Sequence, residues 1–475
     1  MLFTSYAFPV FVFGALCAYY AVGRITRNHG PQNLTLVLSG YLFYALWDWR
    51  WCGLLALVTL SGWLGGRLLT RGCIHARLVV AAVAVSNLAV LGMFKYFQFF
   101  ADSLRTLLTS VGLRADGITL GLVLPVGVSY YVFQNLSYVF DAYRGAITHA
   151  SGLLNYSTAL SFFPQLLAGP ITRPLALLPQ LAERREFNAP LAKDGLRQIL
   201  WGLTKKMLIA DTIGARVDST WANLESSDGL SLALTAVLYS VQIYCDFSGY
   251  ADIAIGTAKL FNLRLAKNFS YPYMASSVRD FWRRWHMTLS SWMRDYVYIP
   301  LGGNRVGTAR RHLNVMLTFA AVGLWHGANW TFIVWGALHG AYLVMEGWFQ
   351  GRTRPAAMRP RWVAQVRTAA RAVVVFIAVT VAWIFFRAPS LGTAFDYFGQ
   401  ALAAPLAREG YGAFVPSLAF AAALLVYEWL TRRWDHGLSI ARLPLPARWA
   451  LYLAFCVALL VAGDLGGREG IYVQF

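Results

Sequence analysis

The sequence predicts an all-α, polytopic membrane protein, and three observations carry this prediction. Of 475 residues, 57% are hydrophobic and only 13% are charged, whereas charged residues make up about 25% of an average soluble domain. The mean hydropathy of the chain is +0.49. Apolar runs of about 16 to 25 residues recur along the sequence, and a run of this length can cross a bilayer as a helix.

The charge and the cysteines of the chain fit the same class. Lys and Arg outnumber Asp and Glu by 41 to 22, a net charge of +19. Such an excess would suggest nucleic acid in a soluble protein, but cytoplasmic loops of membrane proteins also collect Lys and Arg. We therefore expect contact with membrane lipid and no nucleic-acid partner. The five cysteines show neither CxxC pairing nor metal-ligand spacing, so we expect no disulfide framework and no bound metal.

The first four apolar runs are residues 6–22, 34–47, 52–66 and 78–100. No basic stretch precedes the first run, and Arg24 and Arg27 follow it. We therefore expect a retained transmembrane helix rather than a cleaved signal peptide, with the N-terminus outside the cell membrane. Arginines after residue 66 place the next loop in the cytoplasm by the same rule.

Two runs in the middle of the chain are interrupted. Pro125 and Gly127 predict a kink in the run at 118–140. The run at 153–167 ends in AGPITRP and is followed by basic residues as far as Lys206, which we assign to a cytoplasmic loop. Basic flanks on the same side imply a re-entrant segment or a hairpin, which needs protein around its backbone.

Polar residues then concentrate near a further expected break. The run at 199–213 crosses outward, and the run at 230–244 returns and leads into CDFSG, where we expect the helix to break. Gln242, Asp246 and Ser248 lie there at membrane depth. Buried polar groups of this kind either form a satisfied network between helices or serve a function, and both interpretations stay open.

The remaining apolar runs are residues 313–326, 330–345, 372–386, 416–430 and 449–462. The basic loop at 352–371 belongs in the cytoplasm, which puts the C-terminus outside together with the N-terminus. We expect about ten or eleven full spans with additional surface and re-entrant helices. They would form a single integral-membrane domain over residues 1–475.

The stretch at 277–304 combines aromatic, basic and glycine residues with a histidine, His286. Its large side chains recur at steps of three or four and form one stripe: Phe281, Trp285, Leu289, Trp292 and Tyr296. Ser277 and Asp280 have the spacing of a capping box, and Gly302 lies where the helix should stop. The pattern predicts an amphipathic helix that lies along the membrane surface.

A second histidine lies in an uncharged, apolar environment. His326 occurs in GLWHGANWTFIVWG, and an imidazole there needs a polar partner or water. Imidazole is the usual general base for a hydroxyl near neutral pH, so it suits acyl transfer. The sequence lacks GxSxG, HExxH, P-loop and GxGxxG motifs in a suitable context, which argues against hydrolases, zinc proteases and nucleotide-binding proteins.

The two histidine motifs together resemble a known family. DFWRRWHMTLSSWMRDYVYIPLGGNR, followed by GLWHGANWTFIVWG, is similar to the signature of the membrane-bound O-acyltransferase family, in particular its bacterial alginate O-acetylation branch. Further segments resemble the branch in the same order, and these are LPVGVSYYVFQNLSYVFDAYRG, FFPQLLAGPITR, GLTKKMLIADT, QIYCDFSGYADIAIG and IYVQF. The resemblance covers nearly the whole chain.

The resemblance implies a ring of helices around a central tunnel, with His326 as the catalytic residue and His286 as the second histidine. The residues expected to bind the coenzyme A part of the donor are Arg283, Arg284, Trp285 and Asn304. Both arginines suit phosphates, although they also satisfy the positive-inside rule. The residues expected to line the tunnel are Gln242, Asp246, Ser248, Trp325 and Trp330. Whether His326 acts as general base or as acyl relay stays open.

Members of this branch take acetyl from a cytoplasmic thioester, and acetyl-CoA is the expected donor, with no permanently bound cofactor. They pass the acetyl group to a periplasmic SGNH-type acetyltransferase that modifies a polysaccharide acceptor. The resemblance thus implies an enzyme of the bacterial inner membrane with both termini periplasmic and with alginate or a similar exopolysaccharide as acceptor. Cellulose and peptidoglycan are alternative acceptors, and a non-enzymatic glycan or lipid transporter is the competing class.

Overall fold

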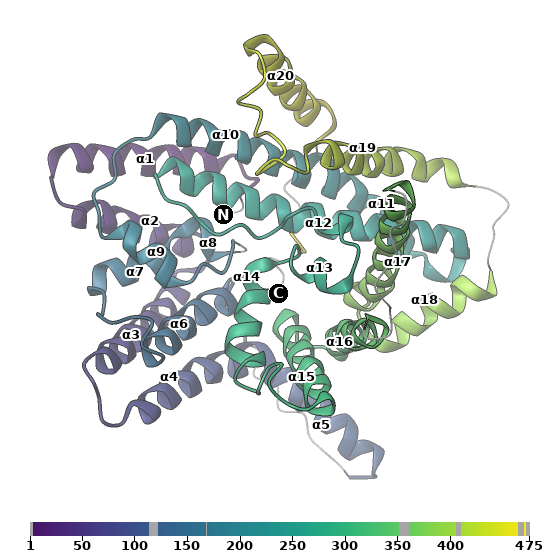
Figure 1. The fold of residues 1–475 in the computed structure, drawn as a ribbon, viewed down its shortest axis with the longest axis horizontal. Coiled ribbons are helices and arrows are strands. Elements are labelled where there is room, and N and C mark those ends of the chain that lie inside the picture. Colours follow the sequence, from purple (N-terminus) through teal and green to yellow (C-terminus); the bar gives the residue numbers. More distant parts are fainter. Residues whose placement is uncertain are drawn as a thin grey trace. The chain divides into compact units, whose positions relative to one another are not determined.

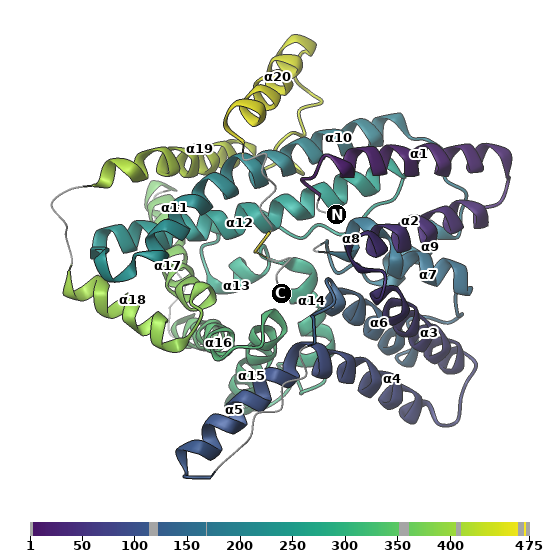
Figure 2. The same cartoon turned by 180° about the vertical axis from the view of Figure 1, so that it is seen from behind.

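A computed structural model describes residues 3–113, 122–167, 169–350, 361–404, 410–463 and 470–471. In this part of the chain, twenty α-helices are joined by turns and by short π- and 3₁₀-helices, and no β-strand occurs. Figure 1 labels the helices in chain order, and Figure 2 shows them from behind. The predicted all-α class is confirmed.

Seven stretches of the described chain are helical, long enough and apolar enough to cross a membrane. They are α1 (Ala7–Ile25), α3 (Trp51–Thr70), the stretch Ala76–Ser110 from α4 to α5, α12 (Gly229–Leu260), α17 (Arg361–Arg387), the stretch Tyr411–Thr431 that contains α19, and α20 (Leu445–Ala462). The chain is therefore polytopic, as predicted, with fewer long apolar helices than the ten or eleven expected spans.

Two of the expected spans are divided into shorter helices, which explains part of this difference. The run at 153–167 forms α7 (Leu153–Ser161) and α8 (Phe163–Leu166), and a non-helical segment then leads to α9 (Pro174–Leu181). Proline and glycine in FFPQLLAGPITRP account for these interruptions. The run at 199–213 is shared by three consecutive helices, which are α10 (Ala189–Leu203), the π-helix η2 (Thr204–Ala210) and α11 (Asp211–Ala222).

The described chain divides into two compact units, and the prediction of a single domain stays a prediction. The first unit consists mainly of Met1–Gly195 with Ala254–Ala266, and the second of Leu196–Ile253 with Lys267–Tyr472. Helix α12 contributes residues to both. All residues of the expected catalytic and tunnel sites belong to the second unit.

The first unit has a buried arginine at the junction of its helices. α2 (Gly30–Asp48) packs against α1 and α7, and α3 packs against α6 (Val128–Tyr143). The Arg185 guanidinium donates to the Tyr19 hydroxyl, to the Asn33 side-chain oxygen and to the Gln180 carbonyl. Arg185 is buried and lies in the connection between α9 and α10, and its assignment to a cytoplasmic loop stays a prediction. In the sequence Arg185 lies among basic residues. In the structure, three hydrogen-bond acceptors from separate segments offset the free-energy cost of burying its guanidinium group.

Two predicted breaks are not found where the sequence placed them. Helix α12 runs without interruption through CDFSG. Its Gly249 instead permits close helix packing, because a Cβ added there would lie 2.8 Å from the Gly202 carbonyl oxygen of α10. Gly127 does not kink a helix either. It has a φ of 73° and precedes the first residue of α6, so the helix begins there.

The stretch at 277–304 was predicted as one surface helix, and this prediction was wrong. It forms α13 (Val278–Trp282), α14 (Met287–Met293) and the π-helix η5 (Arg294–Tyr298). The expected cap at Ser277 is present, since its side chain accepts from the Asp280 N–H at 3.0 Å. The aromatic stripe is buried inside the protein instead of facing lipid, as the complete burial of Trp285 illustrates.

Candidate functional site: two buried histidines

His326 is placed by a tightly packed helix pair. It is the last residue of α15 (Thr308–His326), which packs against α16 (Trp330–Gln350). A Cβ added at Gly323 or at Gly336 would come within 2.2 Å of a backbone oxygen of the other helix. Only glycine allows this approach, so the register of the two helices fixes the position of His326. Its side chain is 1% exposed.

His286 lies at the interruption between α13 and α14. Its backbone is left-handed, with φ 41° and ψ 53°, a conformation that costs about 1–3 kcal/mol for a non-glycine residue and is common at functional sites. Hydrogen bonds to residues 268–270 hold this turn: the Ser270 N–H donates to the Arg284 carbonyl, and the Met287 N–H donates to the Asn268 carbonyl, both at 2.9 Å.

The structure brings the two predicted histidines together. Their ring centroids are 6.2 Å apart, at an interplanar angle of 64°. Trp325, a predicted tunnel residue, contacts both rings, with centroid distances of 5.5 Å to His286 and 5.0 Å to His326. The histidines come from motifs about forty residues apart in sequence, so the fold creates the pair.

The two ring nitrogens of His286 have different surroundings. Its Nδ1 lies 3.1 Å from the Asn268 Oδ1, whereas its Nε2 is buried and has no hydrogen-bond partner among the described residues. His286 lies outside the seven candidate spans, and burial lowers its pKa to about 3. The imidazole is therefore neutral at physiological pH. The sequence contained no signal for Asn268, which lies in the connection after α12.

Aromatic side chains surround the pair and exclude water from it. Phe247 of α12 lies 4.7 Å from the ring of His286, and Trp335 and Phe386 lie 5.0 and 5.3 Å from the ring of His326, between centroids. Trp335 is completely buried, and its indole N–H has no hydrogen-bond partner among the described residues. A desolvated site of this kind strengthens any electrostatic interaction formed inside it.

A third buried histidine adjoins the pair. His339 accepts a hydrogen bond from the Trp282 Nε1–H at 3.3 Å, and its ring lies 5.0 Å from that of Trp335. Trp335 therefore separates His339 from His326. His339 is thus a core histidine whose hydrogen bond links α16 to α13.

The predicted tunnel residues Asp246 and Ser248 belong to a network with two lysines. Lys206 donates to Asp246 and to Asp211, both at 2.7 Å, and Lys205 donates to Ser248 at 2.8 Å. The remaining oxygen of Asp246 accepts from the Ile471 N–H at 2.8 Å. These contacts favour the interpretation of a satisfied network between helices. The side-chain oxygen of Gln242, the third of these predicted tunnel residues, is buried and has no hydrogen-bond partner among the described residues.

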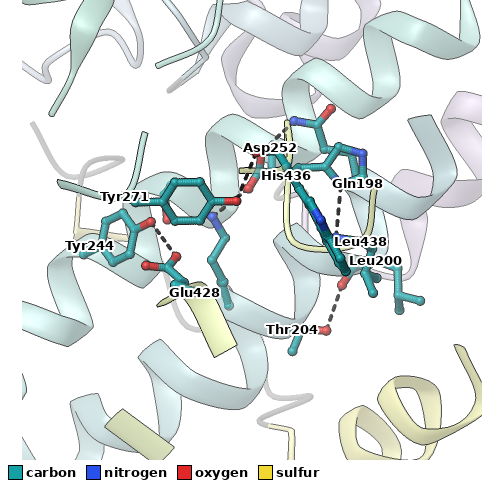
Figure 3. Close-up of polar contacts among 12 residues, drawn as sticks. Gln198, Leu200, Thr204, Tyr244, Asp252, Tyr271, Glu428, His436 and Leu438 are labelled. Carbon is teal, nitrogen blue, oxygen red and sulfur yellow. Dashed lines mark hydrogen bonds and ion pairs between the residues drawn. The ribbon is translucent and has the colours of Figure 1, made fainter. Parts of the chain in front are cut away.

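Lys205 links Ser248 to Asp252, which lies one turn further along α12, and Figure 3 shows Asp252 beside Gln198. The Asp252 carboxylate accepts from the Gln198 side chain and from Lys205, both at 2.6 Å. Nearby, the Tyr244 hydroxyl donates to Glu428 at 2.6 Å (Figure 3). Lys205 and Lys206 were missed because they were assigned to a cytoplasmic loop. Two lysines in the apolar segment WGLTKKMLIA were the signal, since intramembrane charges are rare and need partners.

The residues expected to bind coenzyme A do not converge on the pair. Arg283 is exposed, and Arg284 is paired with Asp280 at 2.9 Å. Asn304 is exposed and accepts from the Tyr298 hydroxyl at 2.7 Å. Trp285 is buried and stacks on Phe281, with ring centroids 5.5 Å apart.

Trp330, an expected tunnel residue, is 50% exposed at the start of α16. Among the described residues, no group of three or more His, Cys, Asp or Glu side chains is arranged to hold a metal ion.

The all-α, multi-pass fold and the two buried histidines 6.2 Å apart agree with the membrane acyltransferase family that the sequence resembles. The sequence model of the membrane-bound O-acyltransferase (MBOAT) family matches residues 129–386, a segment that contains both histidines. The chain belongs to this family, and it is an acyltransferase.

Several bacterial relatives cover most of the chain. The protein named "Probable alginate O-acetylase AlgI" from Azotobacter vinelandii is 39% identical over 371 residues, which are 77% of this chain and 72% of the relative. A protein of the same name from Pseudomonas aeruginosa is 38% identical over 408 residues, 84% of this chain and 74% of the relative. A "Peptidoglycan O-acetyltransferase" from Helicobacter pylori is 33% identical over 419 residues, 81% and 77% of the two chains.

Proposed function

We propose that this membrane O-acyltransferase moves acetyl from a cytoplasmic thioester, acetyl-CoA, across the inner membrane for O-acetylation of an extracytoplasmic polysaccharide. The observation that carries the proposal is the buried His286–His326 pair, with ring centroids 6.2 Å apart. A group of the size of a thioester carbonyl or a hydroxyl can contact both imidazoles at this separation. The acceptor follows from the relatives, of which two are named alginate O-acetylases.

In the proposed reaction an acceptor hydroxyl attacks the acetyl carbonyl carbon. An oxygen–carbon bond forms, the carbon–sulfur bond breaks, and the hydroxyl proton ends on the departing coenzyme A thiolate. An imidazole accepts this proton and returns it to the sulfur. If His326 itself takes the acetyl group as a relay, the same bonds change in two steps. The buried indole N–H of Trp335 is a donor suited to the oxygen on which negative charge develops.

The proposed partner is a periplasmic SGNH-type acetyltransferase that receives the acetyl group and modifies the polymer. Both termini are then periplasmic, and the enzyme is embedded in the lipid of the inner membrane. Peptidoglycan is the second candidate acceptor, favoured by the 33% identity to the H. pylori peptidoglycan O-acetyltransferase.

Mass analysis of the secreted polysaccharide tests the proposal. In a strain that lacks the native copy, the wild-type chain should restore polymer acetylation, and His326→Ala or His286→Ala should not. His149→Ala, which changes an exposed histidine, is the matched control and should restore it fully. Acetylation of peptidoglycan with no change in the polysaccharide would favour the second acceptor. Wild-type acetylation by both histidine variants at normal protein abundance would exclude the proposed site.

A further inference from the structure

The side chain of Asn268 is in direct contact with His286. Asn268 is completely buried and follows α12 in the chain. Its Oδ1 lies 3.1 Å from the Nδ1 of His286. The backbone oxygen of Asn268 accepts from the Met287 N–H at 2.9 Å, so the side-chain and backbone oxygens both hold the turn that carries the histidine, while Nδ2 has no hydrogen-bond partner among the described residues.

The orientation of the Asn268 carboxamide follows from its other partners. Its Oδ1 also accepts from the Thr288 backbone N–H at 3.3 Å and from the Thr288 hydroxyl at 2.8 Å. A backbone N–H can only donate, so the atom that meets it must be the oxygen and not the NH₂ group. The flipped carboxamide would place two donors against each other.

This orientation determines where His286 carries its proton. The Asn268 oxygen can only accept, so the Nδ1 of His286 must donate to it and must carry the hydrogen. A neutral imidazole has one N–H, so its Nε2 then presents a lone pair. That Nε2 is buried and has no hydrogen-bond partner among the described residues.

We propose that Asn268 is a positioning residue that holds His286 as its Nδ1–H tautomer, so that the Nε2 lone pair of His286 is the proton acceptor of the acyl transfer. This rests on the proposed function and specifies which of the two imidazoles accepts the proton in the proposed reaction. The acceptor hydroxyl loses its proton to Nε2 as its oxygen bonds to the acetyl carbon. The Nδ1–H bond to Asn268 persists throughout, and the proton passes from Nε2 to the thiolate when the carbon–sulfur bond breaks.

The dry surroundings of His286 fit this role. A desolvated neutral imidazole is a poor base before substrate binds, because its buried, aromatic surroundings do not stabilise the cation that protonation creates. It becomes a good base when negative charge develops on the substrate oxygen next to it. The imidazole thus accepts the proton only in the transition state, and stabilisation of the transition state relative to the ground state raises the rate of acyl transfer.

Three substitutions distinguish a role of Asn268 in positioning His286 from a role in folding. Asn268→Leu removes the acceptor at nearly constant volume, and turnover should fall on the order of 10²-fold, as for other groups that orient a reactive side chain. Asn268→Asp keeps an oxygen against Nδ1 and should retain turnover within about tenfold. Thr288→Val removes only the hydroxyl donor and leaves the backbone N–H, so it should retain nearly wild-type turnover.

Nitrogen NMR of the protein with ¹⁵N-labelled histidine measures the tautomer directly, and the His286→Gln spectrum assigns the signal by subtraction. The wild-type and Asn268→Asp proteins should show Nδ1 protonated and Nε2 bare, and Asn268→Leu should lose this preference. A wild-type His286 protonated at Nε2, or an Asn268→Leu protein with unchanged tautomer and turnover, would overturn the proposal. Because the spectrum needs no reaction, an inactive protein with the expected tautomer would instead count against the proposed function.

Discussion

At the scale of single residues, the strongest electrostatic feature of the second unit is the Lys206 cluster. Its ammonium group lies 2.7 Å from both Asp246 and Asp211 and is 1% exposed. Two carboxylates thus share one buried cation, and the Ile471 N–H satisfies one further oxygen. Removal of the cation would leave buried negative charges without compensation.

Lys206→Met should therefore destabilise the protein strongly. Breaking a buried ion pair by removing one partner costs about 3–5 kcal/mol, and the unfolding temperature of the detergent-solubilised protein measures the loss. Lys259→Met is the matched control, because its 2.6 Å pair with Asp194 is only partly buried, so loss of the cation there should cost less free energy of unfolding. Equal unfolding temperatures for the two variants would contradict the account.

Single residues show which parts of the site the sequence could predict. His286 and His326 were singled out by the two motifs that resemble the family signature, and His326 also by its uncharged, apolar surroundings. Asn268 could not, because its role depends on a contact with a residue eighteen positions later that no local pattern encodes. Lys205 was mistaken for a loop residue, because the positive-inside rule counts charges without regard to partners on another helix.

At the scale of elements, the pairing of α15 with α16 controls the position of His326. Gly336 is one of the points of closest approach, since a Cβ there would lie 2.2 Å from the Phe319 carbonyl oxygen. An added methyl group must push the helices apart, and His326 at the end of α15 would move with them.

Gly336→Ala should thus reduce both stability and transfer. An overpacked interior costs about 1–3 kcal/mol, and a displacement of about 1 Å at a reacting group can cost on the order of 10²-fold in rate. Gly347→Ala, in the same helix with open space around the added Cβ, should leave transfer unchanged. Parallel assays of unfolding temperature and of polymer acetylation check both statements, and they would contradict the account if both variants behaved alike.

Contacts between helices and their connections account for two errors of the sequence-based prediction, one in the stretch at 277–304 and one at CDFSG. The three-to-four-residue spacing of Phe281, Trp285 and Leu289 correctly predicted helical structure with one aromatic face. The interruption at His286 was missed, because it is enforced by hydrogen bonds from residues 268–270. The break expected in CDFSG was wrong because Gly249 serves helix packing, and a sequence does not distinguish a glycine that breaks a helix from one that packs it.

At the scale of the whole molecule, the membrane class was predictable because hydropathy is a sum over the chain. Errors at single runs barely change such a sum, so the all-α, polytopic class was predicted correctly while the limits of individual spans were not. The proposed topology rests on the same kind of sum, taken over basic residues, and stays a prediction.

Reporter fusions test this topology. Alkaline phosphatase, which is active only outside the cytoplasm, should be active when fused to the C-terminus and inactive when fused after residue 360, directly before the first residue of α17, Arg361. Equal protein amounts on an immunoblot control for expression. An active phosphatase fusion at residue 360 together with an inactive fusion at the C-terminus would show that the orientation is the reverse of the proposed one.

We propose that the buried histidine pair transfers acetyl from a cytoplasmic thioester, and a labelling experiment in membrane vesicles tests this proposal. Inside-out membrane vesicles that carry the enzyme, its partner and the polymer are given acetyl-CoA labelled in the acetyl group, and the label bound to polymer is counted. We predict label in the wild-type and His149→Ala vesicles and a loss on the order of 10²-fold or more for His286→Ala and for His326→Ala. Polymer labelled at the wild-type rate by both histidine variants, or no label from acetyl-CoA in wild-type vesicles that acetylate their polymer, would contradict the account.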